Sequence, residues 1–118
     1  MATYKNSAQV LKGLLDAMVL MALSRRDNYG FAIYQEITTQ MRDDADLFKE
    51  SSLYPLLHRL EAKGFVDYYW KPGDRGTDRK YYKITESGKT HLNERINDWL
   101  KVVRVLERTI LFGKGVIK

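Results

Sequence analysis

Apolar residues recur at helical spacing in the middle of the chain. Between positions 51 and 64, leucines occupy positions i, i+3, i+4 and i+7, so they share one face of a helix. Ser51 or Ser52 is suited to cap the start of this helix, and Pro55 suits its first turn. Gly64 provides a left-handed stop. The spacing therefore predicts a short amphipathic helix, whose buried stripe is formed by Leu53, Leu56, Leu57 and Leu60.

The segment after this helix alternates between strand-forming and turn-forming residues. Residues 65–70 and 80–84 are rich in aromatic and branched side chains, whereas residues 71–79 hold a proline and two glycines, which predicts a β-hairpin with a polar tip. A helix followed by a basic hairpin is typical of a winged helix-turn-helix, whose wing lies against the sugar-phosphate backbone. An ordinary amphipathic helix without DNA contacts is the alternative. The hairpin is basic because Lys71, Arg75, Arg79, Lys80 and Lys83 outnumber Asp67, Asp74 and Asp78.

Two further helices are predicted ahead of the leucine-rich segment. Residues 7–25 carry an apolar stripe wide enough to serve both the core and an interface. Residues 27–30 are turn-forming, and apolar residues then repeat every four positions from Ile33 to Met41. The acidic residues 43–46 are expected to form a solvated loop, because no turn glycine or later bidentate glutamate completes a calcium site.

The last predicted helix begins at Thr85, a suitable N-cap, and continues to about Phe112, before Gly113 and Gly115 end it. Its apolar residues have the spacing of the a and d positions of a coiled coil. We therefore expect a homodimer through this helix and, by two-fold symmetry, a roughly palindromic operator. The alternative is a stripe that packs on the first helix of the same chain. The expected dimer interface consists of Leu92, Ile96, Trp99, Val103, Leu106 and Ile110.

Composition fits one small globular domain. The 118 residues are 44% hydrophobic and 30% charged. We expect a mainly α fold with a β-hairpin wing, in which residues 1–84 form a winged helix-turn-helix DNA-binding domain and residues 85–118 a C-terminal dimerisation helix of the same compact unit. The net charge of +5 favours polyanionic partners. No apolar run reaches membrane-spanning length and no signal peptide is recognisable, so a cytoplasmic protein is expected.

Catalytic chemistry is not indicated. The chain has no cysteine, and its two histidines, His58 and His91, lie on separate predicted helices without a zinc-binding or nucleophile-activating arrangement. Residues 73–76 lack the lysine and hydroxyl residue of a phosphate-binding loop. We therefore expect no enzymatic activity, no metal and no cofactor.

Several short motifs, in their order and spacing, are shared with a known family over nearly the whole chain. The matching segments are Gly13-Leu14-Leu15-Asp16-Ala17, Tyr29-Gly30, Leu53-Tyr54-Pro55-Leu56-Leu57, Arg59-Leu60-Glu61, Arg79-Lys80-Tyr81-Tyr82 and Thr85-Glu86-Ser87-Gly88. On these segments the chain resembles the PadR-type transcriptional regulators. It departs from them at Ser51 and Ser52, where members usually carry Gly-Thr or Ala-Thr, so the operator preference cannot be transferred.

The resemblance is greatest to the small, single-C-terminal-helix, multidrug-binding branch of this family. It implies a repressor that leaves its promoter when an effector binds. A tryptophan at the place of Trp99 lines a pore between the subunits of that branch and stacks on planar aromatic or drug-like compounds, and Asp16 could balance a cationic one. The alternative is a tryptophan that only packs in the dimer seam. The resemblance implies a ligand site formed by Gly13, Asp16, Ala17, Ile96, Trp99 and Val103.

Three functions are therefore compared. The favoured one is a dimeric regulator that binds promoter DNA. A winged-helix module that contacts another protein through the aromatic residues 68–70 is the first alternative, and a ligand-carrying or weakly catalytic dimer built around Trp99 is the second. For the favoured function, the expected DNA contacts are Tyr29, Ser51, Ser52, Tyr54, Pro55, His58, Lys71, Arg75, Arg79 and Lys80.

Overall fold

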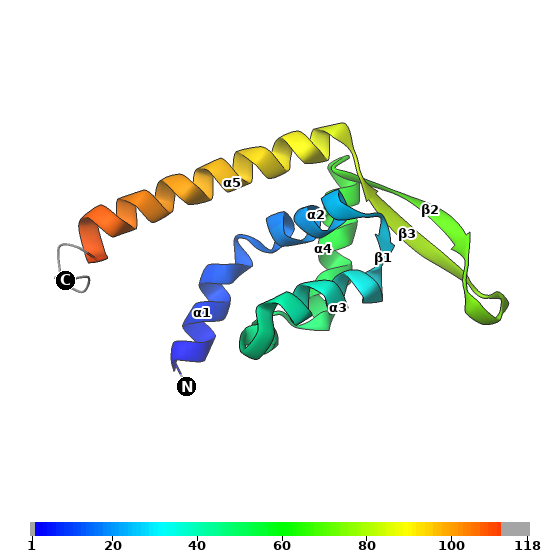
Figure 1. The fold of residues 1–118 in the computed structure, drawn as a ribbon, viewed down its shortest axis with the longest axis horizontal. Helices are drawn as coiled ribbons and strands as arrows, with labels where there is room; N and C mark the ends of the chain where they lie inside the picture. Colours follow the sequence, from blue (N-terminus) through cyan, green and yellow to red (C-terminus); the bar gives the residue numbers. More distant parts are fainter. Residues whose placement is uncertain (1, 112–118) are drawn as a thin grey trace.

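The computed structural model of the chain describes residues 2–111. It is mainly helical, with a β-hairpin wing and a long C-terminal helix, as the sequence predicted. The hairpin and the helix α5 project in opposite directions from the body formed by α2, α3 and α4 (Figure 1). The elements are α1 (Ala2–Lys12), α2 (Leu15–Arg25), β1 (Asn28–Tyr29), α3 (Gly30–Met41), α4 (Glu50–Ala62), β2 (Val66–Pro72), β3 (Asp78–Ile84) and α5 (Glu86–Leu106).

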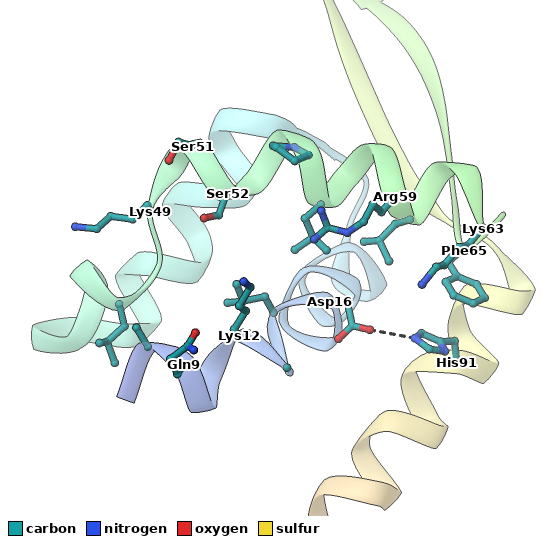
Figure 2. A pocket seen from close by; sticks show the side chains of 17 residues that line it. Gln9, Lys12, Asp16, Lys49, Ser51, Ser52, Arg59, Lys63, Phe65 and His91 are labelled. Carbon is teal, nitrogen blue, oxygen red and sulfur yellow. Dashed lines mark hydrogen bonds and ion pairs between the residues drawn. The ribbon is translucent and has the colours of Figure 1, made fainter. Parts of the chain in front are cut away.

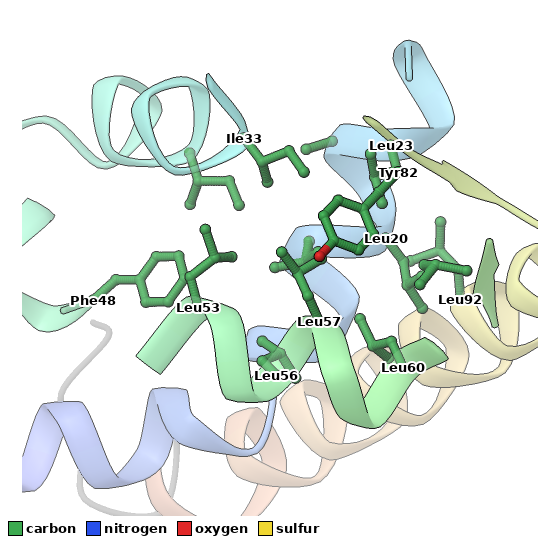
Figure 3. Close-up of a cluster of buried hydrophobic side chains, with 14 residues drawn as sticks. Leu20, Leu23, Ile33, Phe48, Leu53, Leu56, Leu57, Leu60, Tyr82 and Leu92 are labelled. Carbon is green, nitrogen blue, oxygen red and sulfur yellow. The ribbon is translucent and has the colours of Figure 1, made fainter. Parts of the chain in front are cut away.

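The hydrophobic core lies where α2, α3, α4 and the base of the hairpin meet (Figure 3). The leucine stripe of α4 is its centre, since Leu53 and Leu57 are completely buried and Leu56 and Leu60 are at most 5% exposed. Burying such side chains contributes about 1.5 to 3 kcal/mol each. The periodicity prediction for this helix is confirmed, and the other largest buried side chains are Val19, Leu20, Leu23, Ile33 and Phe48.

The single helix predicted for residues 7–25 is wrong. The chain breaks at Gly13 and Leu14 into α1 and α2, which are bent by 58° relative to one another. A glycine inside a helical pattern lowers its helix propensity by about 1 kcal/mol, so the break falls at the weakest point of the segment. Among residues 2–111 no single helix is both long and apolar enough to cross a membrane; only the bent pair Asn6–Lys12 and Leu15–Arg25, taken together, meets that length and composition.

The turn predicted for residues 27–30 is also wrong in part. Asn28 and Tyr29 form the short strand β1, which pairs with Tyr82 and Tyr81 of β3. The sheet therefore has three antiparallel strands in the order β1-β3-β2. This pairing brings the start of α3 against the wing.

The cap predicted for α4 differs from the observed one. The helix starts at Glu50, its N-cap is Lys49, and Ser51 and Ser52 lie within the first turn. Pro55 consequently falls in the second turn instead of the first. Phe48, immediately before the cap, is 1% exposed and fixes the point at which the chain enters the helix.

Both ends of the hairpin are fixed by terminal motifs that the sequence predicted. Gly64 has a φ of +79°, and the N–H of the next residue donates to the carbonyl of Leu60 at 2.9 Å, which closes α4. Thr85 caps α5 by accepting from the N–H of Gly88 at 3.0 Å. After Leu106 the helix continues as one π-helical turn to Leu111, and the predicted end at residues 112–115 lies outside the described residues.

The acidic segment predicted as a loop forms a short 3-10 helix, Arg42–Leu47, between α3 and α4. Within the part of the chain that the structure describes, no group of three His, Cys, Asp or Glu side chains is arranged to hold a metal ion.

Candidate nucleic-acid interface

The outward side of α4 carries the side chains predicted to reach DNA. Because the leucine stripe faces the core, Ser51, Ser52, Tyr54, Pro55 and His58 are all exposed. Hydroxyl, phenol and imidazole groups at the N-terminal half of an exposed helix can donate to phosphates and to base edges in a major groove. The apolar stripe of α4 is therefore buried in the core, and its polar side chains are exposed to solvent.

Tyr54 sits closely over the start of α3. A Cβ atom at Gly30 would lie 2.6 to 2.9 Å from Cε1, Cζ and the hydroxyl oxygen of Tyr54, so a larger residue there would push the Tyr54 side chain aside. Burial, followed by the nearby Glu50 carboxylate, raises the pKa of the Tyr54 phenol. The phenol therefore stays neutral and available as a hydrogen-bond donor.

A hollow of about 360 Å³ joins three elements on this side of the molecule. Tyr29 from the β1–α3 junction, Tyr54 and His58 from α4, and Arg79 and Lys80 from β3 all line it. These five residues, all predicted as DNA contacts, are thus neighbours in space although they come from separate parts of the chain.

The outer face of the wing carries cations that stack on tyrosines. The Arg79 guanidinium lies 4.3 Å from the centre of the Tyr29 ring, and the Lys71 ammonium lies 4.7 Å from that of Tyr81. Tyr69 completes this face by stacking on Tyr81 at 5.8 Å. Such contacts, worth about 0.5 to 1 kcal/mol at exposed sites, hold the cations in place while leaving their donors outward.

The inner face of the wing holds one further predicted contact. The Lys80 ammonium lies 4.1 Å from the centre of the Tyr68 ring and 3.5 Å from a carboxylate oxygen of Glu61. Lys80 is therefore partly neutralised within the molecule. Among the four predicted wing contacts, Lys71 and Arg75 are exposed, whereas Arg79 and Lys80 are half-buried.

A hydrogen bond that the sequence did not predict holds the wing to the α2–β1 loop. The Tyr69 hydroxyl donates to the Asp27 carboxylate at 2.8 Å. This hydrogen bond is the main cause of the raised pKa of Tyr69. No local pattern signals it, because the two residues are 42 positions apart.

The residues predicted as a ligand site do not share one cavity, and Gly13 and Asp16 line a separate cleft between α1 and α4. Ala17 and Ile96 line an apolar hollow of about 260 Å³ between α2 and α5. Trp99 lies farther along α5 and is 46% exposed, and Val103 is half-buried. The described chain therefore brings Ala17 and Ile96 together, but Trp99 does not line that hollow.

Asp16, predicted to balance a cationic ligand, already has partners within the chain, one of which is the Arg95 guanidinium. Its carboxylate lies 3.1 Å from Nε2 of His91 and 3.4 Å from Nε of Arg95. Arg95 also donates to the carbonyl of Gly13, while Phe65 stacks on the His91 ring at 4.2 Å. This cluster ties the start of α2 to α5, and sequence reasoning missed it because Asp16 is 75 and 79 positions away from His91 and Arg95.

The predicted seam of α5 changes character along its length. Leu92 is 5% exposed and Ile96 packs against the core, so for these two residues the intramolecular alternative holds. Trp99, Leu106 and Ile110 are 46%, 41% and 48% exposed in the single chain. The distal part of the seam is thus a row of apolar side chains available to a second molecule.

Comparison with known proteins places this arrangement in a family. Residues 19–94 match the family model described as the transcriptional regulator PadR-like family. An uncharacterized protein of Lysinibacillus sphaericus is 33% identical over 109 residues, 92% of this chain and 96% of that protein.

Solved structures of transcriptional regulators have a similar fold. A transcriptional regulator from Clostridium thermocellum has a TM-score of 0.77 and 28% identity, with 86% of this chain and 98% of that chain covered. A PadR-like transcriptional regulator from Bacillus cereus has a TM-score of 0.73 and 29% identity, with 85% and 94% covered. PadR proteins are transcriptional regulators, not enzymes, and bind DNA. By the family model, the curated relative and the fold together, the chain belongs to the PadR-like family of transcriptional regulators.

Proposed function

We propose that the chain is a homodimeric repressor that reads promoter DNA with the N-terminal half of α4 and holds the backbone with the wing. The observation that carries this proposal is the shared hollow lined by Tyr29, Tyr54, His58, Arg79 and Lys80. Aromatic, imidazole and cationic groups from three elements line this one hollow. Residues 1–84 would serve as the DNA-binding part and residues 85–118 as the dimerisation part.

Base reading and backbone binding are assigned to different residues. Ser51, Ser52 and His58 are exposed at the end of α4 that would enter a major groove, beside Tyr54 and Pro55. The cations Lys71, Arg75, Arg79 and Lys80 project from the wing, where contacts to phosphates supply affinity without sequence information.

Wing variants test the backbone assignment. Lys71→Ala and Arg79→Ala should each weaken binding to every duplex, because a phosphate contact and its released counterion are lost. The slope of log affinity against log salt should become shallower by about 0.9 per contact. Fluorescence anisotropy of a labelled promoter duplex between low and moderate salt measures both quantities. Lys101→Ala, an exposed cation on α5, is the matched control; unchanged affinity and slope in the wing variants would refute their role.

Dimerisation is proposed through the distal half of α5. Trp99, Val103, Leu106 and Ile110 continue the coiled-coil spacing beyond the part that packs on α2, and three of them are more than 40% exposed. Burying such a row against a symmetry mate removes apolar area from water. Two-fold symmetry would then pair two copies of α4 with a roughly palindromic operator.

We propose that an effector binds at the two-fold axis of this dimer and releases the protein from DNA. In a dimer, Trp99 and its symmetry mate would offer flat apolar faces to a planar aromatic or drug-like compound, with Ile96 and Val103 beside them. Ala17 lines the hollow between α2 and α5 with Ile96, whereas Gly13 and Asp16 line the separate cleft between α1 and α4 and are not assigned to this effector. Because the Arg95 guanidinium already opposes the charge of Asp16, a neutral or weakly charged planar compound is the better expectation.

Tryptophan fluorescence tests the effector proposal. Titration with planar aromatic compounds should give saturable quenching in the wild type and in Trp70→Ala, and none in Trp99→Ala. Trp70, 60% exposed on the wing, serves as the matched control for the second indole of the chain. Quenching that survives in Trp99→Ala would move the ligand site elsewhere.

A second candidate function is a winged-helix protein-interaction module. Tyr68 and Trp70 are 41% and 60% exposed on the edge strand β2, which favours a contact with another protein. Such a module would show no salt-steep duplex binding, so the wing titration above separates the two functions.

A further inference from the structure

A cleft of about 650 Å³ lies between α1 and the start of α2 on one side and α4 on the other (Figure 2). Lys12 points from α1 toward α4, and Arg59 extends from α4 into the opening. The cleft shares no lining residue with the hollow at the wing and does not include Trp99, but Ser51, Ser52 and Pro55 of the proposed DNA-reading surface line it.

The cleft has an excess of positive charge. Lys12, Arg59 and Lys63 line it, and among the described residues no ion pair or side-chain hydrogen bond opposes any of the three. Asp16 is the one carboxylate in its lining, and the Arg95 guanidinium already lies 3.4 Å from it. Cations grouped in a partly enclosed space raise the local potential and attract an anion.

Hydroxyl and apolar groups complete the lining. Ser51 and Ser52 add hydroxyl donors at the N-terminal end of α4. Leu56 and Leu60, 5% and 3% exposed, contribute their outer surfaces to the wall, and Phe65 closes the far end. A site that is cationic at its rim and apolar on its wall suits a molecule with one anionic group on an apolar body.

We propose that this cleft binds a small organic anion, a carboxylate or phosphate carried on an apolar body. The anionic group would lie among Lys12, Arg59 and Lys63, and the body against Leu56 and Phe65. Such a ligand would bridge α1 and α4, and it differs from the planar effector at Trp99 in both position and charge. Any effect of this ligand on promoter occupancy rests on the proposed function, whereas its binding does not.

The test uses two probes with nearly the same apolar body. The fluorescent anion 8-anilinonaphthalene-1-sulfonate is titrated into the full-length protein without DNA, and the neutral N-phenyl-1-naphthylamine is its control. The double variant Arg59→Gln/Lys63→Gln should bind the anion about tenfold more weakly, as expected when charge-assisted contacts worth about 1.4 kcal/mol are lost. Its affinity for the neutral probe should change less than twofold.

Two further variants locate the site. Lys101→Gln, a cation outside the cleft, and Trp99→Ala, at the proposed dimer axis, should both keep wild-type affinity for the anionic probe. Thermal unfolding of each variant shows that the fold is retained. The proposal would be overturned if the double variant lost affinity equally for both probes, or if it kept its affinity for the anionic probe. It would also be overturned if Trp99→Ala lost affinity for the anionic probe.

DNA phosphates share the anionic chemistry of the proposed ligand. The same double variant, Arg59→Gln/Lys63→Gln, distinguishes a cleft that binds DNA from one that binds a free anion. If the cleft holds a free anion, the slope of log duplex affinity against log salt should be that of the wild type. A slope shallower by about one or two, as when phosphate contacts are lost, would assign Arg59 and Lys63 to DNA and overturn the proposal.

Discussion

Replacing Gly88 by alanine should destabilise the protein by about 3 kcal/mol, at the upper end of the range for overpacked sites. A Cβ atom there would overlap the carbonyl oxygen of Phe65 and lie 2.8 Å from Cγ1 of Ile84. The backbone at Phe65 cannot retreat freely, because its carbonyl accepts the N–H of Thr85 at 3.1 Å. The start of α5 and the start of the hairpin would be forced apart.

This joint also carries side-chain hydrogen bonds that the same shift would break. The hydroxyls of Thr85 and Ser87 donate to the carbonyl of Gly64 at 2.6 and 2.9 Å. Urea denaturation of wild type and variant measures the loss. Gly13→Ala is the matched control, since its Cβ would meet nothing closer than 4.0 Å, and its stability should change by less than about 1 kcal/mol. Equal stability of Gly88→Ala and the wild type would show that this contact is not tight.

Leu106→Glu should raise the dimer dissociation constant at least about 100-fold. In the proposed dimer two leucines, each worth about 1.5 to 3 kcal/mol when buried, would be lost and two carboxylates would face one another across the axis. The change leaves the core of the single chain intact, because Leu106 is 41% exposed there. Sedimentation equilibrium over a range of protein concentrations measures the effect.

Val105 provides an unusually close control for this prediction. It is also 41% exposed and adjacent in sequence, but lies outside the coiled-coil spacing. Val105→Glu should therefore leave dimerisation nearly unchanged, and promoter affinity should fall only in Leu106→Glu. If Val105→Glu dissociated the dimer and Leu106→Glu did not, the interface would lie on a different face of α5.

Sequence periodicity predicted the elements whose signals are local. The leucine stripe of α4, the hairpin and the Thr85 cap were all predicted, because each depends on residues within a few positions of one another. The strand β1 was missed, since two residues carry no period and their partners lie more than 50 positions away. The α4 cap was misplaced because Phe48, whose burial fixes the helix start, shows no pattern of its own.

The sequence was sufficient to predict which residues belong to the candidate site. It was not sufficient to predict how their side chains contact one another. Exposed polar positions on α4 follow from the stripe opposite them. The stacking of Arg79 on Tyr29 and the pairing of Lys80 with Glu61 require the folded sheet. The cationic cleft was not predicted either, because Lys12 and Arg59 become neighbours only when α1 bends at Gly13.

The most direct test of the central proposal is the ratio of the affinity for promoter DNA to the affinity for unrelated DNA, measured before and after the exposed side chains of α4 are changed. Anisotropy titrations compare a duplex from the promoter upstream of the gene with a scrambled duplex of equal length, for wild type and for the triple variant Ser51→Ala/Ser52→Ala/His58→Ala. If these side chains read bases, the variant should lose most of the preference for the promoter, about 1 to 3 kcal/mol for each base contact removed, while its affinity for the scrambled duplex is retained. A triple variant that kept the wild-type ratio would contradict the assignment of α4 as the reading helix.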